Sequence, residues 1–247
     1  MQILISIDDT DNLESRGTGE LASLIAEELE SNGWGRAGFV TRHQLLVHPD
    51  IPYTSHNSAM CFPAEIAEGA LEKVIAHAGE FLRRESAPEA DPGLCVAVID
   101  RVVGPDQLLL FGRKAKESVL TKDDAYALAS TLGVHLSEHG GTGQGVIGAL
   151  AGAGLRLGGN DGRLRGSITV PGGAGLVRAA ALRELPEVDL VVCTSGVLVD
   201  DFDLVRICDR PKTVMHRGAS VLLVSAVESD GSEVRWQTLH RKDLKGY

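Results

Sequence analysis

The most constraining feature of the sequence is an apolar run near its start that ends abruptly in carboxylates. Residues 3–7 read Ile-Leu-Ile-Ser-Ile, and Asp8, Asp9, Thr10 and Asp11 follow at once. Apolar, β-branched residues favour a buried strand, whereas a cluster of aspartates cannot continue one. We therefore predict a short central strand over residues 3–7 that carries an acidic loop, residues 8–11, at its end.

A helix start between two glycines follows the acidic loop. Gly17, Thr18 and Gly19 precede residues 20–29, where apolar side chains recur with the helical period. Thr18 is the expected N-cap, and the Asn-Gly pair at residues 32–33 is the expected stop. A strand, a polar loop and an amphipathic helix in this order predict an α/β fold for the N-terminal part.

The elements that follow are predicted from apolar periodicity and glycine content. Strands are expected at residues 39–47, 59–62 and 94–100, and helices at residues 64–84, 106–120 and 122–132. Residues 140–145 read Gly-Gly-Thr-Gly-Gln-Gly and form a glycine loop that opens an apolar helix at residues 146–151. Residues 152–175 are rich in glycine and are expected to be irregular.

The character of the sequence changes after about residue 160, so we predict two domains. Residues 1–160 form the α/β domain, and residues 161–247 form a smaller β-rich, α+β tail. Short β-type runs at residues 190–192, 197–199 and 221–224 support the tail's assignment.

The charge balance bears on the partners. The 247 residues carry 24 Lys and Arg against 34 Asp and Glu, a formal charge of −10. Tight binders of duplex nucleic acid usually present a basic face, because neutralised phosphates supply most of the affinity. The balance argues against DNA and favours a small substrate, or a weak or local contact with RNA. It does not indicate an oligomeric state.

Four cysteines, Cys61, Cys95, Cys193 and Cys208, bear on metal binding and compartment. No two lie two to four residues apart, so zinc-knuckle spacing is absent and we expect buried free thiols. The sequence has no stretch near 18 uninterrupted apolar residues and no charged start followed by an apolar run. These patterns predict a cytoplasmic protein without a membrane span.

The acidic loop suggests metal chemistry. Three carboxylates within four residues repel one another unless a cation neutralises them. Mg²⁺ prefers oxygen ligands and accepts phosphate oxygens in its shell. The favoured interpretation is that Asp8, Asp9 and Asp11 hold Mg²⁺ and face the phosphates of ATP. An Asx-turn with helix-capping acids is the alternative.

Two glycine segments are candidate phosphate sites. Residues 17–19 place backbone N–H groups at a helix N-terminus, where anions bind. Gly141, Gly143 and Gly145 alternate before a helix and predict a backbone nest for phosphate, although the Lys-Ser or Lys-Thr of a Walker A loop is absent. A simple turn is the alternative for each segment.

Basic side chains surround a proline-rich turn at residues 49–53. They are Arg42, His43, His48 and His56, and basic groups in such a place can clamp phosphate. Together with the acidic loop they predict one site, in which Arg42 binds the cofactor. Taken singly, each is better explained as a surface residue with its own hydrogen-bond partners.

Three ordered motifs resemble the agmatidine synthetase family, whose members modify the wobble cytidine of an isoleucine tRNA. Residues 7–11 ahead of residues 17–19 are similar to the start of the family's kinase-like domain. Residues 48–59 resemble its Asn-Pro and Ile-Pro-Tyr segment, and residues 141–149 resemble its Gly-Asn-Gly-x-Gly-hydrophobic-Ile-Gly-Ala loop.

The resemblance implies a kinase-like domain at residues 1–160 and a ferredoxin-like second domain. In the family, ATP activates a carbonyl and the amine agmatine displaces the activated oxygen. The resemblance implies that the aspartates of the acidic loop handle Mg²⁺ and ATP and that Thr18 lies near the triphosphate. Two features depart from the family: residues 54–56 read Thr-Ser-His instead of Lys-Thr-Arg, and the cysteines lack zinc-ribbon spacing.

These observations predict an ATP- and Mg²⁺-dependent ligase or kinase that activates a small carbonyl compound or acid for attack by an amine. A small molecule and an amine are expected as partners in preference to tRNA. Three alternatives stay open: a tRNA-modifying enzyme of the same family, a non-catalytic nucleotide sensor, and a haloacid-dehalogenase-like phosphatase. The phosphatase fits least, because residues 9–13 lack its threonine and residues 194–196 leave no place for its lysine.

Overall fold

The computed structural model describes residues 1–51, 57–170, 175–227 and 234–244 of the chain. The chain divides into two compact units, Met1–Gly158 and Gly159–Tyr247. The division falls inside the glycine-rich segment. Each unit combines helices with strands around its own hydrophobic core, and the predicted α/β fold class is confirmed.

The first unit is built on an antiparallel sheet with the strand order β6-β5-β1-β4-β3, and β2 also pairs with β4. The strands are β1 (Gln2–Asp8), β2 (Gly35–Ala37), β3 (Thr41–Gln44), β4 (Ser58–Ile66), β5 (Gly93–Val98) and β6 (His135–Glu138). The central strand, β1, is antiparallel to both β4 and β5. Because Asp8 ends β1 opposite Gly93, the acidic loop leaves the sheet at its middle and not at an edge.

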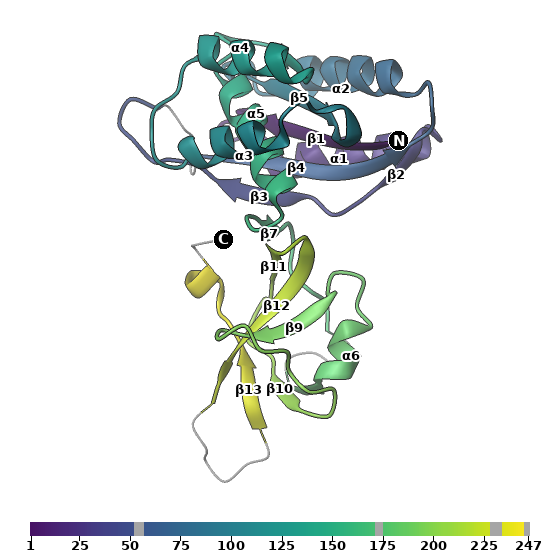
Figure 1. Ribbon diagram of the computed structural model, residues 1–247, viewed down its shortest axis with the longest axis vertical. Coiled ribbons are helices and arrows are strands. Elements are labelled where there is room, and N and C mark those ends of the chain that lie inside the picture. Colours follow the sequence, from purple (N-terminus) through teal and green to yellow (C-terminus); the bar gives the residue numbers. More distant parts are fainter. Residues whose placement is uncertain (52–56, 171–174, 228–233, 245–247) are drawn as a thin grey trace. The chain divides into compact units, whose positions relative to one another are not determined.

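Helices cover both faces of this sheet (Figure 1). They are α1 (Thr18–Ser31), α2 (Leu71–Glu85), α3 (Pro105–Lys114), α4 (Lys122–Leu132) and α5 (Gly145–Gly158), with a 3₁₀ turn, η1 (Ile99–Arg101). Side chains alternate along a strand, so Ile3, Ile5 and Ile7 pack with α1 and α2, while Leu4 packs with α3, α4 and α5. Asp8 therefore lies on the face that α5 covers.

α5 is longer than predicted, because residues 152–158 continue the helix instead of forming irregular structure. Its glycines lie where other groups approach the helix backbone. A Cβ at Gly148 would overlap the carboxylate of Asp8, and one at Gly152 would lie 2.6 Å from Ser6 Oγ. Gly148 and Gly152 are four residues apart, which spans about 6 Å along a helix, and Ser6 and Asp8 are two residues apart, which spans about 6.6 Å along a strand. The two spacings are nearly equal, so each glycine lies opposite one of these side chains. Close packing here outweighs the low helix propensity of glycine.

Other boundaries also differ from the predictions. Residues 64–66, which the sequence assigns to a helix, extend β4, where they alternate buried and exposed and pair with β1 and β2. The helix predicted to reach residue 120 ends at Lys114. β2 and β6 have no clear sequence signal, because they are short and largely half-exposed and so lack an apolar alternation.

The second unit is rich in strands. Its strand order is β7-β11-β12-β13-β10-β8, and β9 runs parallel to β12. The strands are β7 (Arg163–Leu164), β8 (Leu176–Arg178), β9 (Leu190–Cys193), β10 (Leu204–Arg206), β11 (Thr213–His216), β12 (Ala219–Ala226) and β13 (Val234–Thr238), with helices α6 (Ala179–Arg183) and η2 (Arg241–Leu244). Residues 197–199 give only an isolated bridge, between Leu198 and Val192. The ferredoxin-like assignment of this unit stays a prediction.

All four cysteines are free and buried. Among the helices of the described residues, none combines the length and the apolar character needed to cross a bilayer.

Candidate functional site

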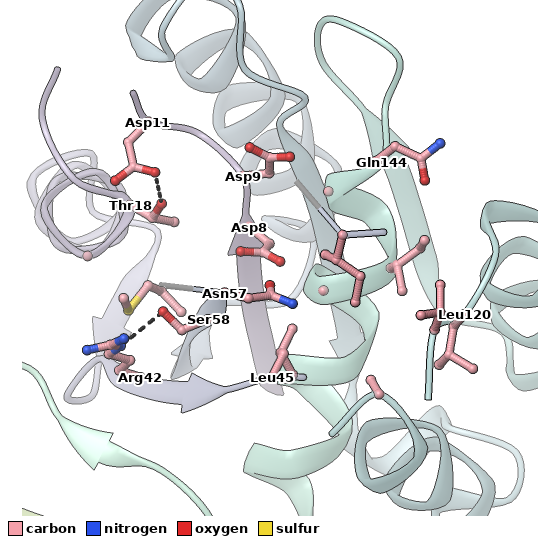
Figure 2. Close-up of a pocket in the computed structure, with 18 of the residues that line it drawn as sticks. Asp8, Asp9, Asp11, Thr18, Arg42, Leu45, Asn57, Ser58, Leu120 and Gln144 are labelled. Atoms are coloured by element: carbon pink, nitrogen blue, oxygen red, sulfur yellow. Dashed lines mark hydrogen bonds between the residues drawn. The ribbon is translucent and has the colours of Figure 1, made fainter. Parts of the chain in front are cut away.

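A cavity of about 570 Å³ opens where the acidic loop meets the N-terminal ends of α1 and α5 (Figure 2). Its lining includes residues that the sequence indicates, namely Asp8, Asp9, Asp11, Gly17, Thr18, Gly19, Arg42 and Gly145. The other lining residues are Leu45, Asp50, Ile51, Asn57, Ser58, Met60, Ala115, Ser118, Val119, Leu120, Gln144, Ile147 and Gly148. The fold thus brings the acidic loop and the end of the glycine loop to one cavity.

Asp8 is the most enclosed of the acidic residues, with 8% of its surface exposed. Burial raises the pKa of its carboxyl from 3.8 to about 8, and the charge of Asp9 adds to the rise. Asp8 is buried because α5 packs over the end of β1. The absence of a side chain at Gly148 leaves the space that the Asp8 carboxylate fills. Asp8 is therefore protonated near neutral pH in the free protein, and a bound cation would favour its charged form.

Asp9 has a left-handed backbone conformation, with φ of 52°, which is uncommon outside glycine but tolerated by aspartate. This turn ends the strand's alternation, so that Asp8 and Asp9 both line the cavity. Burial, followed by the charges of Asp91 and Asp11, raises the pKa of Asp9 to about 6. The loop thus holds negative charge that a cation would stabilise.

The N-terminus of α1 forms a second wall. Gly17 is the N-cap and Thr18 is the first helical residue, so the prediction of Thr18 as the N-cap is wrong. The Thr18 hydroxyl instead donates to Asp11 Oδ1 at 3.3 Å, as Figure 2 shows. The N-cap Gly17 makes no side-chain hydrogen bond to the backbone N–H groups of the first helical turn. A helix N-terminus in this state is a ready site for an anion.

Arg42 is the one basic side chain among the described lining residues. Its Nε donates to Ser58 Oγ at 2.9 Å, and its Nη2 donates to Gln44 Oε1 at 3.2 Å. In Figure 2, Arg42 and Asp11 lie on one side of the cavity, and Leu120 and Gln144 lie on the other. The side with Arg42 is therefore suited to an anionic group.

The histidines expected beside Arg42 do not form one site with it. His43 is fully buried on the opposite face of β3, because consecutive side chains of a strand alternate. His48 lies outside the cavity lining. His56, with most of the Ile-Pro-Tyr segment, lies outside the described residues. Of this predicted basic group, the structure brings only Arg42 to the cavity within the residues that it describes.

Part of the cavity lining, here called the apolar wall, is apolar. It is formed by Leu45, Ala115, Val119, Leu120 and Ile147. Val119 is 46% exposed, so its side chain is accessible to a ligand in the cavity. A cavity that is acidic and anion-binding at one end and apolar at the other suits a ligand with a charged end and an aromatic end.

The glycine loop reaches the cavity only through its last residues. Gly141 and Gly143, predicted to bind the cofactor, are not among the lining residues of the described chain. Their φ values are 54° and 73°, and a Cβ at either would overlap a carboxylate, that of Asp91 or that of Glu138. Acidic side chains next to these glycines repel phosphate, so cofactor binding by Gly141 and Gly143 has no support from the geometry. Gly145, by contrast, lines the cavity.

The donor set fits Mg²⁺ if a bound nucleotide shares the coordination. Within the described residues, no three Asp, Glu, His or Cys side chains gather where they could hold a metal ion by themselves. In nucleotide sites Mg²⁺ usually takes one or two carboxylates together with phosphate oxygens and water. Asp8, which is buried, and Asp9, which is half-buried and raises the pKa of Asp8 by its charge, fit that smaller set.

The sheet, the two helix N-termini and the cavity define an α/β protein with an acidic pocket between helix ends. No protein-family model matches the chain. It is 34% identical over 161 residues to the 2-agmatinylcytidine synthetase TiaS of Methanosarcina acetivorans, which is named for an isoleucine tRNA; the match covers 63% of this chain and 36% of that protein. The resemblance to the agmatidine synthetase family is therefore confirmed. The chain spans about a third of the length of the curated relatives it matches.

Solved structures support the same family resemblance. The chain is similar to the crystal structure of TiaS in complex with an isoleucine tRNA and ATP, with 25% identity and a TM-score of 0.58 over 81% of this chain and 49% of that one. A complex of TiaS with the same kind of tRNA, AMPCPP and agmatine matches with 25% identity and a TM-score of 0.56 over the same shares. The first unit holds 158 of the 247 residues, so a match over 81% of the chain includes residues of the second unit.

These complexes correct the expectation about partners. The prediction that a small molecule is favoured over tRNA is wrong, because the solved structures that the chain resembles contain an isoleucine tRNA. That prediction relied on the charge of the whole chain. Residues 1–158 hold 12 Lys and Arg against 22 Asp and Glu, whereas residues 159–247 hold 12 of each. RNA contacts a local surface, so a sum over the whole chain is a poor guide.

Sequence reasoning missed the apolar wall and Gln144. Gly148 had a detectable signal, because it lies three residues after Gly145 and so shares its helix face. The segment after α3, residues 115–120, carries no motif. Its place in the cavity follows from the packing of α3 against α5, which no local pattern shows.

Proposed function

We propose that this chain is an ATP-dependent tRNA-modifying enzyme of the agmatidine synthetase type. The observation that carries the proposal is the shared cavity of the acidic loop and the N-termini of α1 and α5, in a chain similar to synthetases named for an isoleucine tRNA. Because the chain spans about a third of the relatives' length, the activity, the tRNA and the amine are carried over as proposals.

The first unit would bind ATP across the cavity. The N–H groups of Thr18 and Gly19 and the guanidinium of Arg42 bind phosphate oxygens, and the apolar wall packs against the base. Asp8 and Asp9 hold Mg²⁺, which neutralises charge on the phosphates. Transfer of a phosphoryl or adenylyl group depends mainly on positioning and charge neutralisation, so this set needs no side-chain nucleophile.

The acceptor would be a cytidine of a tRNA and the amine would be agmatine, following the name of the curated relatives and the ligands of the similar complexes. ATP would transfer a phosphoryl group to the carbonyl oxygen of the base, with ADP as the leaving group, or an adenylyl group, with pyrophosphate as the leaving group. The amine nitrogen would then bond to the carbonyl carbon, the activated oxygen would leave as phosphate or as AMP, and the amine proton would pass to solvent.

The test is a turnover assay with Mg²⁺-ATP, a transcript of an isoleucine tRNA and agmatine, with each component omitted in turn. The proposal predicts nucleotide release that tRNA stimulates and that Asp9→Ala abolishes, together with a cytidine whose mass has increased by the amine. Release of AMP indicates adenylyl transfer, and release of ADP indicates phosphoryl transfer. ATP binding without turnover under every condition would instead support a non-catalytic nucleotide sensor.

A further inference from the structure

Asp91 lies between α2 and β5 and outside the cavity lining, yet it contacts the glycine loop at three points. Its Oδ1 accepts the backbone N–H of Thr142, and its Oδ2 accepts the Thr142 hydroxyl at 2.7 Å. Its backbone carbonyl accepts the N–H of Gly145, the first residue of α5, at 3.0 Å. One residue therefore fixes both the middle of the glycine loop and the start of α5.

Asp91 also contacts the acidic loop. The two residues are close enough to affect each other electrostatically, because the charge of Asp91 raises the pKa of the Asp9 carboxyl and the Asp91 backbone N–H lowers it. Asp9 and Gly145 both line the cavity, and Asp91, which is not among the lining residues, adjoins both. Two walls of the cavity that are far apart in the sequence are thus joined through a single residue.

The glycine pattern is explained by this contact. At Gly141 a Cβ would overlap Asp91 Oδ1 and lie 2.7 Å from the carbonyl oxygen of Ala90, and the φ of 54° is one that L side chains rarely adopt. A larger residue at position 141 would therefore push the Asp91 carboxylate off Thr142. On this account Gly141 is needed so that the loop can close on Asp91, not so that it can bind phosphate.

We propose that Asp91 is a positioning residue that holds the N-terminus of α5 and Gln144 in a fixed place relative to Asp9, so that a metal-bound triphosphate meets both at once. This inference rests on the proposed function for its ligand. The clamp itself, Asp91 with Thr142 and Gly145, can be measured without any nucleotide.

Two measurements on the full chain test the clamp. Hydrogen exchange followed by mass spectrometry reports on peptides that contain residues 141–146, and calorimetry measures ATP affinity with Mg²⁺ and with EDTA. Asp91→Ala removes the two carboxylate contacts to Thr142 and keeps the backbone contact to Gly145. It is expected to speed exchange in these peptides and to lower, by about tenfold, the ratio of the ATP affinity with Mg²⁺ to the ATP affinity in EDTA. Affinity in EDTA should change little, whereas a general loss of folding would lower both affinities.

Matched variants separate positioning from bulk stability. Thr142→Val removes one hydroxyl contact and should lie between the wild type and Asp91→Ala, while Thr142→Ser keeps the hydroxyl and should restore wild-type behaviour. Asp100→Ala removes an exposed carboxylate of η1 with the same change of net charge and should leave both measurements unchanged.

The possible outcomes lead to different conclusions about the role of Asp91. Wild-type exchange and wild-type Mg²⁺ dependence in Asp91→Ala would overturn the inference. If Asp91→Ala fails to fold, Thr142→Val decides, and the inference falls if that variant behaves as the wild type. If the unaltered chain does not bind ATP, the proposed function fails and the nucleotide role of Asp91 fails with it, while the exchange data still show whether the clamp exists.

Discussion

The acidic loop and the glycine loop look alike in the sequence, since each is a short polar segment that leads to a helix, yet they meet the cavity in different ways. The acidic loop presents side chains, those of Asp8, Asp9 and Asp11. The glycine loop closes around carboxylates of Asp91 and Glu138, and it reaches the cavity only at its end. A glycine pattern therefore indicates that something approaches the backbone closely. It does not indicate whether that group is a ligand or another part of the protein.

If this contrast is correct, added bulk should damage the glycine loop most, and Gly145→Ala should have the largest effect. A Cβ there would lie 2.8 Å from the Asp8 carbonyl oxygen and closer still to that of Asp91, and backbone atoms cannot swing aside. We expect the free energy of unfolding to fall by about 3 kcal/mol in urea denaturation. Gly175→Ala, where a Cβ meets open space, is the control and should stay within about 0.5 kcal/mol. Equal stability of the two variants would show that the loop has room.

A substitution in the acidic loop should instead raise the free energy of unfolding, because burying the charge of Asp8 destabilises the folded protein. The folded-state pKa of Asp8, about 8, lies above the ordinary value of 3.8. Stability from the protonated carboxyl is therefore fully present below about pH 4 and is lost as the pH rises through 8. Asp8→Asn, which stays neutral, should raise the free energy of unfolding over the wild type by at least about 1 kcal/mol at pH 8 and by little at pH 4. A gain that does not grow with pH would contradict the raised pKa.

Local patterns were sufficient for some elements of this chain. Residues 3–7 and 122–132 fall within β1 and α4, because a short apolar run and a capped amphipathic segment carry their own signal. Asp8, Asp9 and Asp11 were visible as candidates for the same reason. Asp91 and residues 115–120 were not, because their importance arises only when α5 packs against the sheet and α3. The length of α5 was missed because its glycines look irregular until their neighbours are known.

The smallest effect is expected for Lys122, which contacts the outer side of the glycine loop. Lys122 Nζ donates to Glu138 Oε2 at 2.8 Å and to the Thr142 carbonyl at 2.6 Å, in a partly exposed position. Solvent screens such pairs, so Lys122→Ala should lower the free energy of unfolding by only about 0.5 kcal/mol, and the difference should shrink in 1 M salt, roughly where the screening length reaches 3 Å. A loss comparable to that of Gly145→Ala would mean that charge and not close packing holds the loop.

The central claim is that the acidic loop binds the phosphates of ATP through Mg²⁺, and calorimetric titration of Mg²⁺-ATP tests it most directly. The wild type is compared with Asp8→Ala, Asp9→Ala and Asp11→Ala, each with Mg²⁺ and with EDTA. The account predicts binding that depends on Mg²⁺ and that Asp9→Ala weakens by at least about tenfold, roughly 1.4 kcal/mol. Unchanged ATP affinity in all three variants would contradict it.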